Sequence, residues 1–301
     1  MMSDLIRSSI ASLLPLDRVH NGLFIGGIFA VYGIAFICWW FYRTTPPLTR
    51  VYASFPIIAR RVVNAGERPV IFLTLRVSTA SLPTGAHVRI RASIGGEGVV
   101  RSYTPTRFNA GECELMFRVY EGGPMTNYLA SLKVGDVVAM QGPTGLERYA
   151  PAGPGTFSRA ERVWKGITHV ALVSGGTGIT PMLQIANHVL QDAADKTKLS
   201  LVSFTTTVND IMLGDELRAL AEASRGALRL KFVASNASPA QIRGAPDVHQ
   251  SSMRLLTSDS LRELLGVPGG PTTMVCICGP DGFVTRAKEL LQPNFVNVLV
   301  W

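Results

Sequence analysis

The chain has 301 residues, of which 47% are hydrophobic and 17% are charged. This length and composition allow two domains of ordinary size plus an appendage, and they exclude a disordered polymer. The formal net charge is +8, but no lysine-rich block, basic stripe interleaved with aromatic residues or zinc-finger spacing points to a nucleic-acid-binding protein.

The charge excess fits a docking face for an acidic protein or attraction to anionic lipid, with a generally basic soluble surface as the alternative. The four cysteines, Cys38, Cys113, Cys276 and Cys278, are too few and too scattered for a disulfide framework, which indicates a reducing compartment. No two histidines are spaced i, i+4, and none lies beside a cysteine pair, so we predict no metal site.

Residues 1–43 are predicted to form an N-terminal segment with a single transmembrane helix at about 22–42. No charged residue interrupts Gly22–Tyr42, and an aromatic cluster ends this run before Arg43, as expected for a helix of about 20 residues that crosses a bilayer. A cleaved signal peptide and a buried helix of a soluble protein are the alternatives. Arginines that follow the run predict that the rest of the chain faces the cytosol; they are Arg43, Arg50, Arg60 and Arg61.

Residues 44–50 contain Pro46-Pro47 and are predicted to form a linker. Residues 51–150 are predicted to form an antiparallel β-barrel, because short segments rich in β-forming residues alternate with Gly, Pro or Asn. These segments are 61–63, 70–77, 87–92, 114–119 and 136–141. One helix is expected within this domain, over 127–133, with Thr126 as its N-cap.

Residues 151–166 begin with a Pro/Gly stretch and are predicted to link the barrel to a second domain. In residues 167–301 apolar strands alternate with helices, which predicts an α/β domain with a parallel, Rossmann-like sheet. The expected strands are 169–174, 199–205, 228–234, 273–278 and 296–301, and the expected helices start near 180, 213, 260 and 282.

Two motifs carry most of the functional signal. Arg101-Ser102-Tyr103-Thr104-Pro105 offers a planar guanidinium that can hold phosphate, a ring and two hydroxyl groups, which suits a flavin site. Further donors could come from the amides of Met125 and Thr126 at a helix start. Gly175 to Pro181 is a glycine-rich turn between a strand and a helix, but Pro181 stands where the dinucleotide fingerprint has its third glycine. Thr180 is expected to cap the helix and Pro181 to begin it.

Together with Cys278-Gly279-Pro280 and the segment 121–129, these motifs resemble those of the NADH-cytochrome b5 reductases within the ferredoxin-reductase superfamily. The resemblance covers roughly residues 50 to 301. It implies an FAD-binding barrel and an NAD-binding domain in a membrane-anchored enzyme that passes electrons from NADH through FAD to cytochrome b5. It further implies a location at the endoplasmic reticulum or the mitochondrial outer membrane.

The resemblance also implies roles for individual residues. FAD would be held by Arg101, Ser102, Tyr103, Thr104, Gly123, Met125, Thr126 and Thr177. NADH would be held by Gly175, Gly176, Gly178, Pro181, Asp210, Cys278, Gly279 and Pro280. Thr104 and Cys278 would take part most directly in the reaction, Thr104 by a hydrogen bond to the flavin edge and Cys278 by placing the nicotinamide without forming a covalent bond.

Some features leave alternatives open. Asp210 favours NADH over NADPH if it meets the ribose, but it could simply cap the following helix. Pro124 replaces a lysine of the family that assists dinucleotide binding, and the role of the terminal Trp301 is not defined by the sequence. The acceptor could instead be a ferric chelate, a quinone or another haem protein or flavoprotein. From another class, the chain could be a non-catalytic, membrane-tethered nucleotide-binding module.

Overall fold

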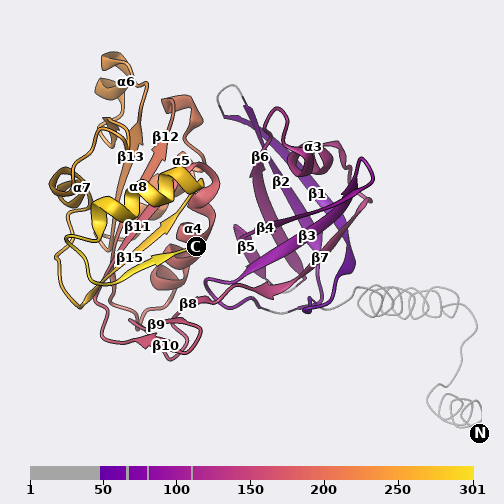
Figure 1. The fold of residues 1–301 in the computed structure, drawn as a ribbon, viewed down its shortest axis with the longest axis horizontal. Helices are drawn as coiled ribbons and strands as arrows, with labels where there is room; N and C mark the ends of the chain where they lie inside the picture. Colours follow the sequence, from indigo (N-terminus) through magenta and orange to yellow (C-terminus); the bar gives the residue numbers. More distant parts are fainter. Residues whose placement is uncertain (1–47, 66–67, 80, 110) are drawn as a thin grey trace, which may run out of the picture. The chain divides into compact units, whose positions relative to one another are not determined.

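A computed structural model describes residues 48–65, 68–79, 81–109 and 111–301. The predicted membrane span at 22–42 lies outside these residues. Among the residues described, no helix is both long and apolar enough to cross a bilayer. From Leu48 to the C-terminus the chain belongs to one compact unit, which contains an antiparallel sheet followed by a parallel one (Figure 1).

The antiparallel sheet has seven strands in the order β4-β3-β7-β1-β2-β6-β5. Their bounds are β1 Ala53–Ala65, β2 Arg68–Arg76, β3 His87–Ile94, β4 Glu97–Tyr103, β5 Arg107–Asn109, β6 Glu112–Arg118 and β7 Val137–Thr144. Strand β3 shows why these segments pair, because Val88, Ile90 and Ala92 are buried whereas Arg89 and Arg91 are exposed, which is the period-2 pattern of a half-buried strand. The predicted antiparallel architecture is confirmed.

Helix α3 (Pro124–Ser131) packs against β3 and β4. The prediction that Thr126 caps this helix was wrong, since Gly123 is the N-cap and Pro124 occupies the first helical position. Proline suits that position because the first amide of a helix has no acceptor within the helix. Thr126 lies in the first turn, where its hydroxyl donates to the Gly123 carbonyl at 3.1 Å.

A small sheet with the order β10-β9-β8 follows, formed by β8 (Glu147–Tyr149), β9 (Phe157–Arg159) and β10 (Arg162–Trp164). Two of its strands therefore lie in the segment predicted as an inter-domain linker. Tyr149 and Phe157 are buried, with their rings edge to face at a centroid distance of 4.9 Å. Both belong to the same hydrophobic cluster as Leu172 of the parallel sheet. Burial of these rings therefore explains why this segment forms regular strands instead of an extended linker.

The parallel sheet has the order β14-β13-β12-β11-β15-β16. Its strands are β11 His169–Gly175, β12 Lys198–Thr205, β13 Leu228–Ala234, β14 Val248–Gln250, β15 Thr273–Cys278 and β16 Val298–Val300. Its helices are α4 Ile179–Gln191, α5 Gly214–Ala223, α6 Pro239–Gly244, α7 Ser258–Leu265 and α8 Asp281–Leu291, with 3-10 turns η1 Gly176–Gly178 and η2 Val208–Asp210. Helix α6 and strand β14 were not predicted.

Alternate residues of β11 explain why its sequence is apolar throughout. Val170 and Leu172 enter one hydrophobic cluster, which includes residues of α4 and α5, whereas Ala171 and Val173 enter a second, which includes residues of α7 and α8. A parallel strand with helices on both faces has no solvent-facing side. The predicted parallel α/β domain is confirmed.

Candidate active site

Two loops of the parallel domain meet at the point where the strand order reverses. The chain leaves β11 and continues to β12 on one side, while β15 pairs with β11 on the other side. The turn η1, Gly176–Gly178, follows β11, and Gly279 follows Cys278 at the end of β15, so both lie at the carboxyl ends of adjacent strands. Open α/β sheets bind their ligands at such a switch point.

Glycines make this close approach possible. A Cβ atom at Gly178 would overlap the carbonyl oxygen of Cys278, and one at Gly279 would lie 2.7 Å from the Phe283 ring. A Cβ at Gly175 would lie 2.9 Å from the same ring. A glycine backbone can approach a neighbouring chain closely because it has no Cβ. In the structure these glycines let the η1 turn lie directly against the end of β15.

The start of α4 differs from the prediction. The helix begins at Ile179 with Gly178 as its N-cap, so Thr180 does not cap it and Pro181 does not begin it. Thr180 instead donates its hydroxyl to the Thr177 carbonyl at 3.2 Å. Proline is tolerated in this first turn because its missing N–H has no acceptor within the helix.

The antiparallel domain supplies the opposite wall from the end of β4. Tyr103 packs edge to face against Phe117, with the ring centroids 6.3 Å apart. Burial raises the pKa of Tyr103 to about 12, with the nearby Arg101 acting in the opposite direction. The phenol is therefore neutral at physiological pH. Thr104 follows directly and is half-buried.

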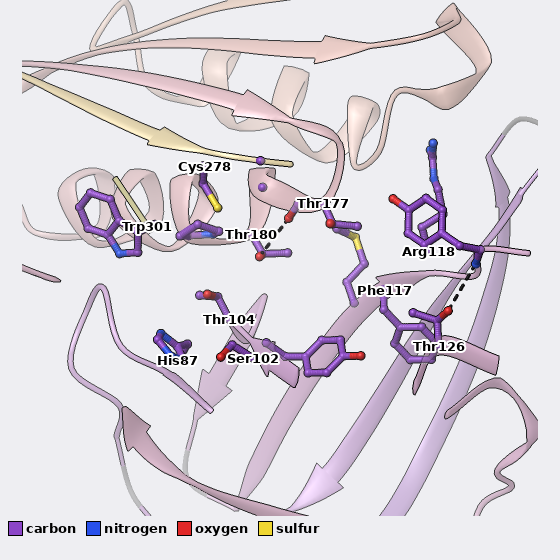
Figure 2. Close-up of a pocket in the computed structure, with 16 residues that line it drawn as sticks. His87, Ser102, Thr104, Phe117, Arg118, Thr126, Thr177, Thr180, Cys278 and Trp301 are labelled. Carbon is purple, nitrogen blue, oxygen red and sulfur yellow. Dashed lines mark hydrogen bonds between the residues drawn. The ribbon is translucent and has the colours of Figure 1, made fainter. Parts of the chain in front are cut away.

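These walls enclose a cavity of about 370 Å³, within the size range of small-molecule and cofactor sites. Figure 2 shows Thr177, Thr180, Cys278 and Trp301 facing Ser102, Thr104 and His87 across it. Nine of the sixteen predicted site residues line the cavity: Ser102, Tyr103, Thr104, Thr126, Thr177, Gly178, Pro181, Cys278 and Gly279.

The other predicted residues lie outside the cavity lining; they are Arg101, Gly123, Met125, Gly175, Gly176, Asp210 and Pro280. Met125 is buried in the core of the antiparallel domain, and Pro280 is the N-cap of α8. Arg101 is exposed, and its Nη1 donates to the Val100 carbonyl at 2.8 Å. In the described part of the chain Arg101 forms no ion pair, so its guanidinium keeps most of its donors free for a ligand.

Sequence reasoning missed seven residues that line the cavity: His87, Met116, Phe117, Arg118, Tyr120, Thr180 and Trp301. Three of them come from β6, which was predicted only as a strand of the barrel. Burial lowers the pKa of His87, and Arg89 and Arg148 act in the same direction against Glu147. The imidazole is therefore neutral at pH 7.

Arg118 and Asp210 join the two domains beside the cavity. Nη1 of Arg118 lies 3.0 Å from Oδ1 of Asp210, and Nη2 donates to the Asp210 carbonyl at 2.8 Å. The second carboxylate oxygen accepts from the Thr207 amide and hydroxyl, completing a capping box on η2. Asp210 therefore does not cap the following helix α5, whose N-cap is Leu213; it closes the capping box of η2 from the third position of that turn. Arg118 Nε is buried and has no hydrogen-bond partner among the residues that the structure describes.

Cys278 and Trp301 complete the side of the cavity formed by the parallel domain. Burial raises the pKa of the Cys278 thiol to about 11, so it is a neutral thiol and a poor nucleophile at physiological pH. Trp301 donates its backbone N–H to the Ile277 carbonyl at 2.9 Å and its indole Nε1–H to the Gly85 carbonyl at 3.2 Å. The terminal residue therefore both extends the last strand and lines the cavity.

The residues present fit a flat cofactor flanked by a dinucleotide. Ring and proline surfaces of Tyr103, Phe117 and Pro181 supply flat apolar walls, and hydroxyl groups of Ser102, Thr104 and Thr177 supply hydrogen-bonding edges. Arg118, which also lines the cavity, has a buried Nε–H without a hydrogen-bond partner among the described residues. Such a donor requires an acceptor to offset its desolvation, and a bound cofactor can provide one.

Comparison with known proteins agrees with this geometry. Residues 58–149 match the Oxidoreductase FAD-binding domain and residues 172–289 the Oxidoreductase NAD-binding domain. NADH-cytochrome b5 reductase 1 of Laccaria bicolor is 32% identical over 267 residues, covering 85% of this chain and 80% of the relative. NADH-cytochrome b5 reductase 2 of Gallus gallus is 35% identical over 229 residues, covering 71% of each chain.

Among solved structures, the cytochrome b5 reductase domain of Ulva prolifera nitrate reductase shares the fold, with a TM-score of 0.74 and 24% identity over 85% of this chain and 100% of that chain. A ferredoxin NADP+ reductase from Neisseria gonorrhoeae, solved with bound FAD and NADP, has a TM-score of 0.62 and 18% identity over 83% of this chain and 98% of that chain. The predicted resemblance, with FAD and NADH as cofactors, is confirmed.

Proposed function

The chain belongs to the NADH-cytochrome b5 reductase family of FAD-dependent oxidoreductases, and from this premise we propose that its cavity aligns NADH with FAD and that cytochrome b5 accepts the electrons. One observation carries the proposal, namely a single cavity lined by Tyr103, Thr177 and Cys278 from the two domains. Bound FAD would supply the chemistry that converts a two-electron donor into single-electron transfers. The protein's part is to bind, orient and exclude water.

On the flavin side, the free donors of Arg101 would hold phosphate, together with the first amides of α3 after Gly123 at Met125 and Thr126. Tyr103 would lie against the ring system, and Ser102, Thr104 and Thr177 would hydrogen-bond its edges. The neutral state of Tyr103 supports this role, because an ionised phenol beside the ring would repel the electron density that the ring receives.

On the dinucleotide side, Gly175, Gly176 and Gly178 would let the backbone approach the ligand, with Pro181 forming the floor. Cys278, followed by Gly279 and Pro280, would place the nicotinamide by contact alone, since the thiol is protonated at neutral pH. Asp210 would meet the ribose through lone pairs not used by Arg118 and Thr207, which favours NADH.

Cytochrome b5 as the acceptor is supported by exposed positive charge at the edge of the cavity. The rim arginines, Arg89 and Arg91, are exposed on β3, the strand that begins with the lining residue His87. Within the described part of the chain they form no ion pair. A cluster of uncompensated cations attracts an acidic partner and raises the association rate at low salt.

The test is electron transfer to cytochrome b5 as a function of salt. We expect kcat/KM for cytochrome b5 to fall as salt rises and to fall about tenfold at low salt in an Arg89→Gln/Arg91→Gln double variant. Arg243→Gln, which removes an exposed arginine from α6, is the matched control and should behave like the unmodified protein. If turnover depends on neither salt nor the rim arginines and proceeds well with a ferric chelate or a quinone, the acceptor is a small molecule and not cytochrome b5.

Membrane attachment through residues 22–42 is the second part of the proposal. It is supported by the uncharged run Gly22–Tyr42, and it would hold the enzyme at the endoplasmic reticulum or the mitochondrial outer membrane with its catalytic part in the cytosol. Co-sedimentation with liposomes tests it. The full chain should pellet with the lipid at high salt, and a chain that dissociates in salt would have only an electrostatic surface contact.

A further inference from the structure

A turn of the antiparallel domain is held by the parallel domain outside the cavity. The Gly85 amide donates to Gln184 Oε1 at 2.6 Å, and the Gly85 carbonyl accepts from the Trp301 indole at 3.2 Å. Next to it, Thr84 Oγ1 lies 2.8 Å from His188 Nδ1. The first two contacts bind the backbone of Gly85 and the third binds the Thr84 side chain, so the turn is held through both.

The same turn is fixed within its own domain. The Ala86 amide donates to the Pro83 carbonyl at 2.9 Å, and the Tyr149 amide donates to the Thr84 carbonyl at 3.0 Å. Gly85 has φ +96°, and a Cβ there would lie 2.6 Å from the Glu147 carbonyl oxygen. The turn therefore cannot move without moving the strand beside it. His87 comes directly after the turn, begins β3 and lines the cavity.

Helix α4 connects this turn to the other wall of the cavity. Thr180 lines the cavity in the first turn of the helix, and Gln184 and His188 follow at intervals of four residues. Positions i, i+4 and i+8 share one face of a helix, about 6 Å apart along its axis. The opposite face is anchored by buried residues of α4, including Met182, Ile185 and Val189. One rigid element thus touches both the cavity and the turn.

We propose that Gln184 is a positioning residue for hydride transfer, which acts through the 84–86 turn to set the distance between the flavin wall and the nicotinamide wall of the cavity. The inference rests on the function proposed above. Hydride transfer needs the reacting atoms about 3–3.5 Å apart, and an error near 1 Å lowers the rate on the order of a hundredfold. Because Gln184 accepts from a backbone amide one residue from Ala86 and two from His87, its loss displaces the flavin wall without removing any group that touches either cofactor.

The test compares Gln184→Ala with Gln191→Ala, a matched control at an exposed residue at the end of the same helix. In Gln184→Ala we expect normal FAD content, a saturating rate of anaerobic flavin reduction lowered about 10- to 100-fold, and a half-saturating NADH concentration within twofold of normal. The long-wavelength absorbance of stacked flavin and nicotinamide should weaken. Gln191→Ala should match the unmodified protein in all four measurements.

Two further measurements separate positioning from general damage. In Gln184→Ala, hydrogen exchange should speed up at the amides of residues 84–87 while exchange in β11 and β15 stays unchanged. Gln184→Glu keeps an acceptor oxygen for the Gly85 amide but loses the Nε2 donor to the Ala86 carbonyl, 3.5 Å away, so it should recover only part of the rate. If Gln184→Ala does not fold, Thr84→Val takes its place, since it removes the Thr84 hydroxyl from His188 and keeps the side-chain shape; its rate should fall severalfold.

If NADH reduces the unmodified protein normally and reduces Gln184→Ala equally fast, the inference is wrong and the proposed function stands. Loss of rate that follows loss of FAD, or faster exchange throughout both domains, would also overturn the inference. No flavin reduction in the unmodified protein would refute the proposed function, and this inference with it.

Discussion

Replacing Arg118 with methionine removes a cation from the junction of the two domains. The guanidinium makes two contacts with Asp210, at 3.0 Å to the carboxylate and 2.8 Å to the carbonyl. The side chains are only 10% and 14% exposed, so solvent screens the pair weakly. Methionine keeps much of the length of the side chain and none of its charge.

The expected loss of stability depends on the contacts that Asp210 keeps when Arg118 is replaced. Removing one partner of a buried ion pair costs about 3–5 kcal/mol when the other charge is stranded. Here Asp210 keeps the Thr207 amide and hydroxyl, at 3.2 and 2.8 Å, and some contact with solvent. We therefore expect a decrease of about 2–3 kcal/mol in the free energy of unfolding for Arg118→Met.

Urea unfolding of Arg118→Met, Asp210→Asn and the double variant measures this contribution. The double variant should lose less stability than the sum of the two single variants, by about 1–2 kcal/mol, because the pair can be broken only once. A loss below about 1 kcal/mol in Arg118→Met, with strictly additive effects, would show that the pair acts like an exposed one, and the reasoning from burial would be refuted.

Three further predictions concern the cavity. With its pKa near 11 instead of 9.0, Cys278 should carry roughly a hundredfold less thiolate at pH 8 than an exposed cysteine; peptide mass spectrometry should show correspondingly slow reaction with iodoacetamide, and rapid labelling would contradict the burial. Gly178→Ala should lower flavin reduction at least about a hundredfold, since its Cβ overlaps the Cys278 carbonyl, whereas Gly244→Ala, with open space around its Cβ, should be neutral; a fully active Gly178→Ala variant would disprove the packing argument. Burial lowers the pKa of His87 below 6.5. Below that pH the unfolded chain therefore binds more protons than the folded chain, and stability falls as the pH falls. His87→Gln should lessen this fall, and an identical pH dependence of stability in the two proteins would contradict the assignment to His87.

The sequence was informative wherever local chemistry determines structure. The strands of the parallel domain were recognised because β11 and β15 are apolar runs buried on both faces. The motifs at 102–104, 177–178 and 278–279 were found because their residue types are unusual together, and the structure brings all three to one cavity.

The sequence was uninformative where tertiary contacts determine the local structure or bring distant residues together. Strand β4 carries no buried residue in its pattern and so gave no alternation to detect. Thr126 and Thr180 resemble N-caps, yet each helix begins earlier, at Pro124 and Ile179, because threonine in a first turn can bond a preceding carbonyl. The pairing of Arg118 with Asp210 joins residues that no local pattern connects, so the sequence did not identify Arg118 as a lining residue.

Anaerobic titration of the purified full-length protein, followed by visible absorbance, tests the central claim most directly. The account predicts a yellow protein whose flavin absorbance is bleached by one equivalent of NADH and much more slowly by NADPH. A yellow protein that prefers NADPH would contradict the role assigned to Asp210. A colourless protein that neither binds FAD nor oxidises NADH would contradict the assignment of the cavity as a site of hydride transfer.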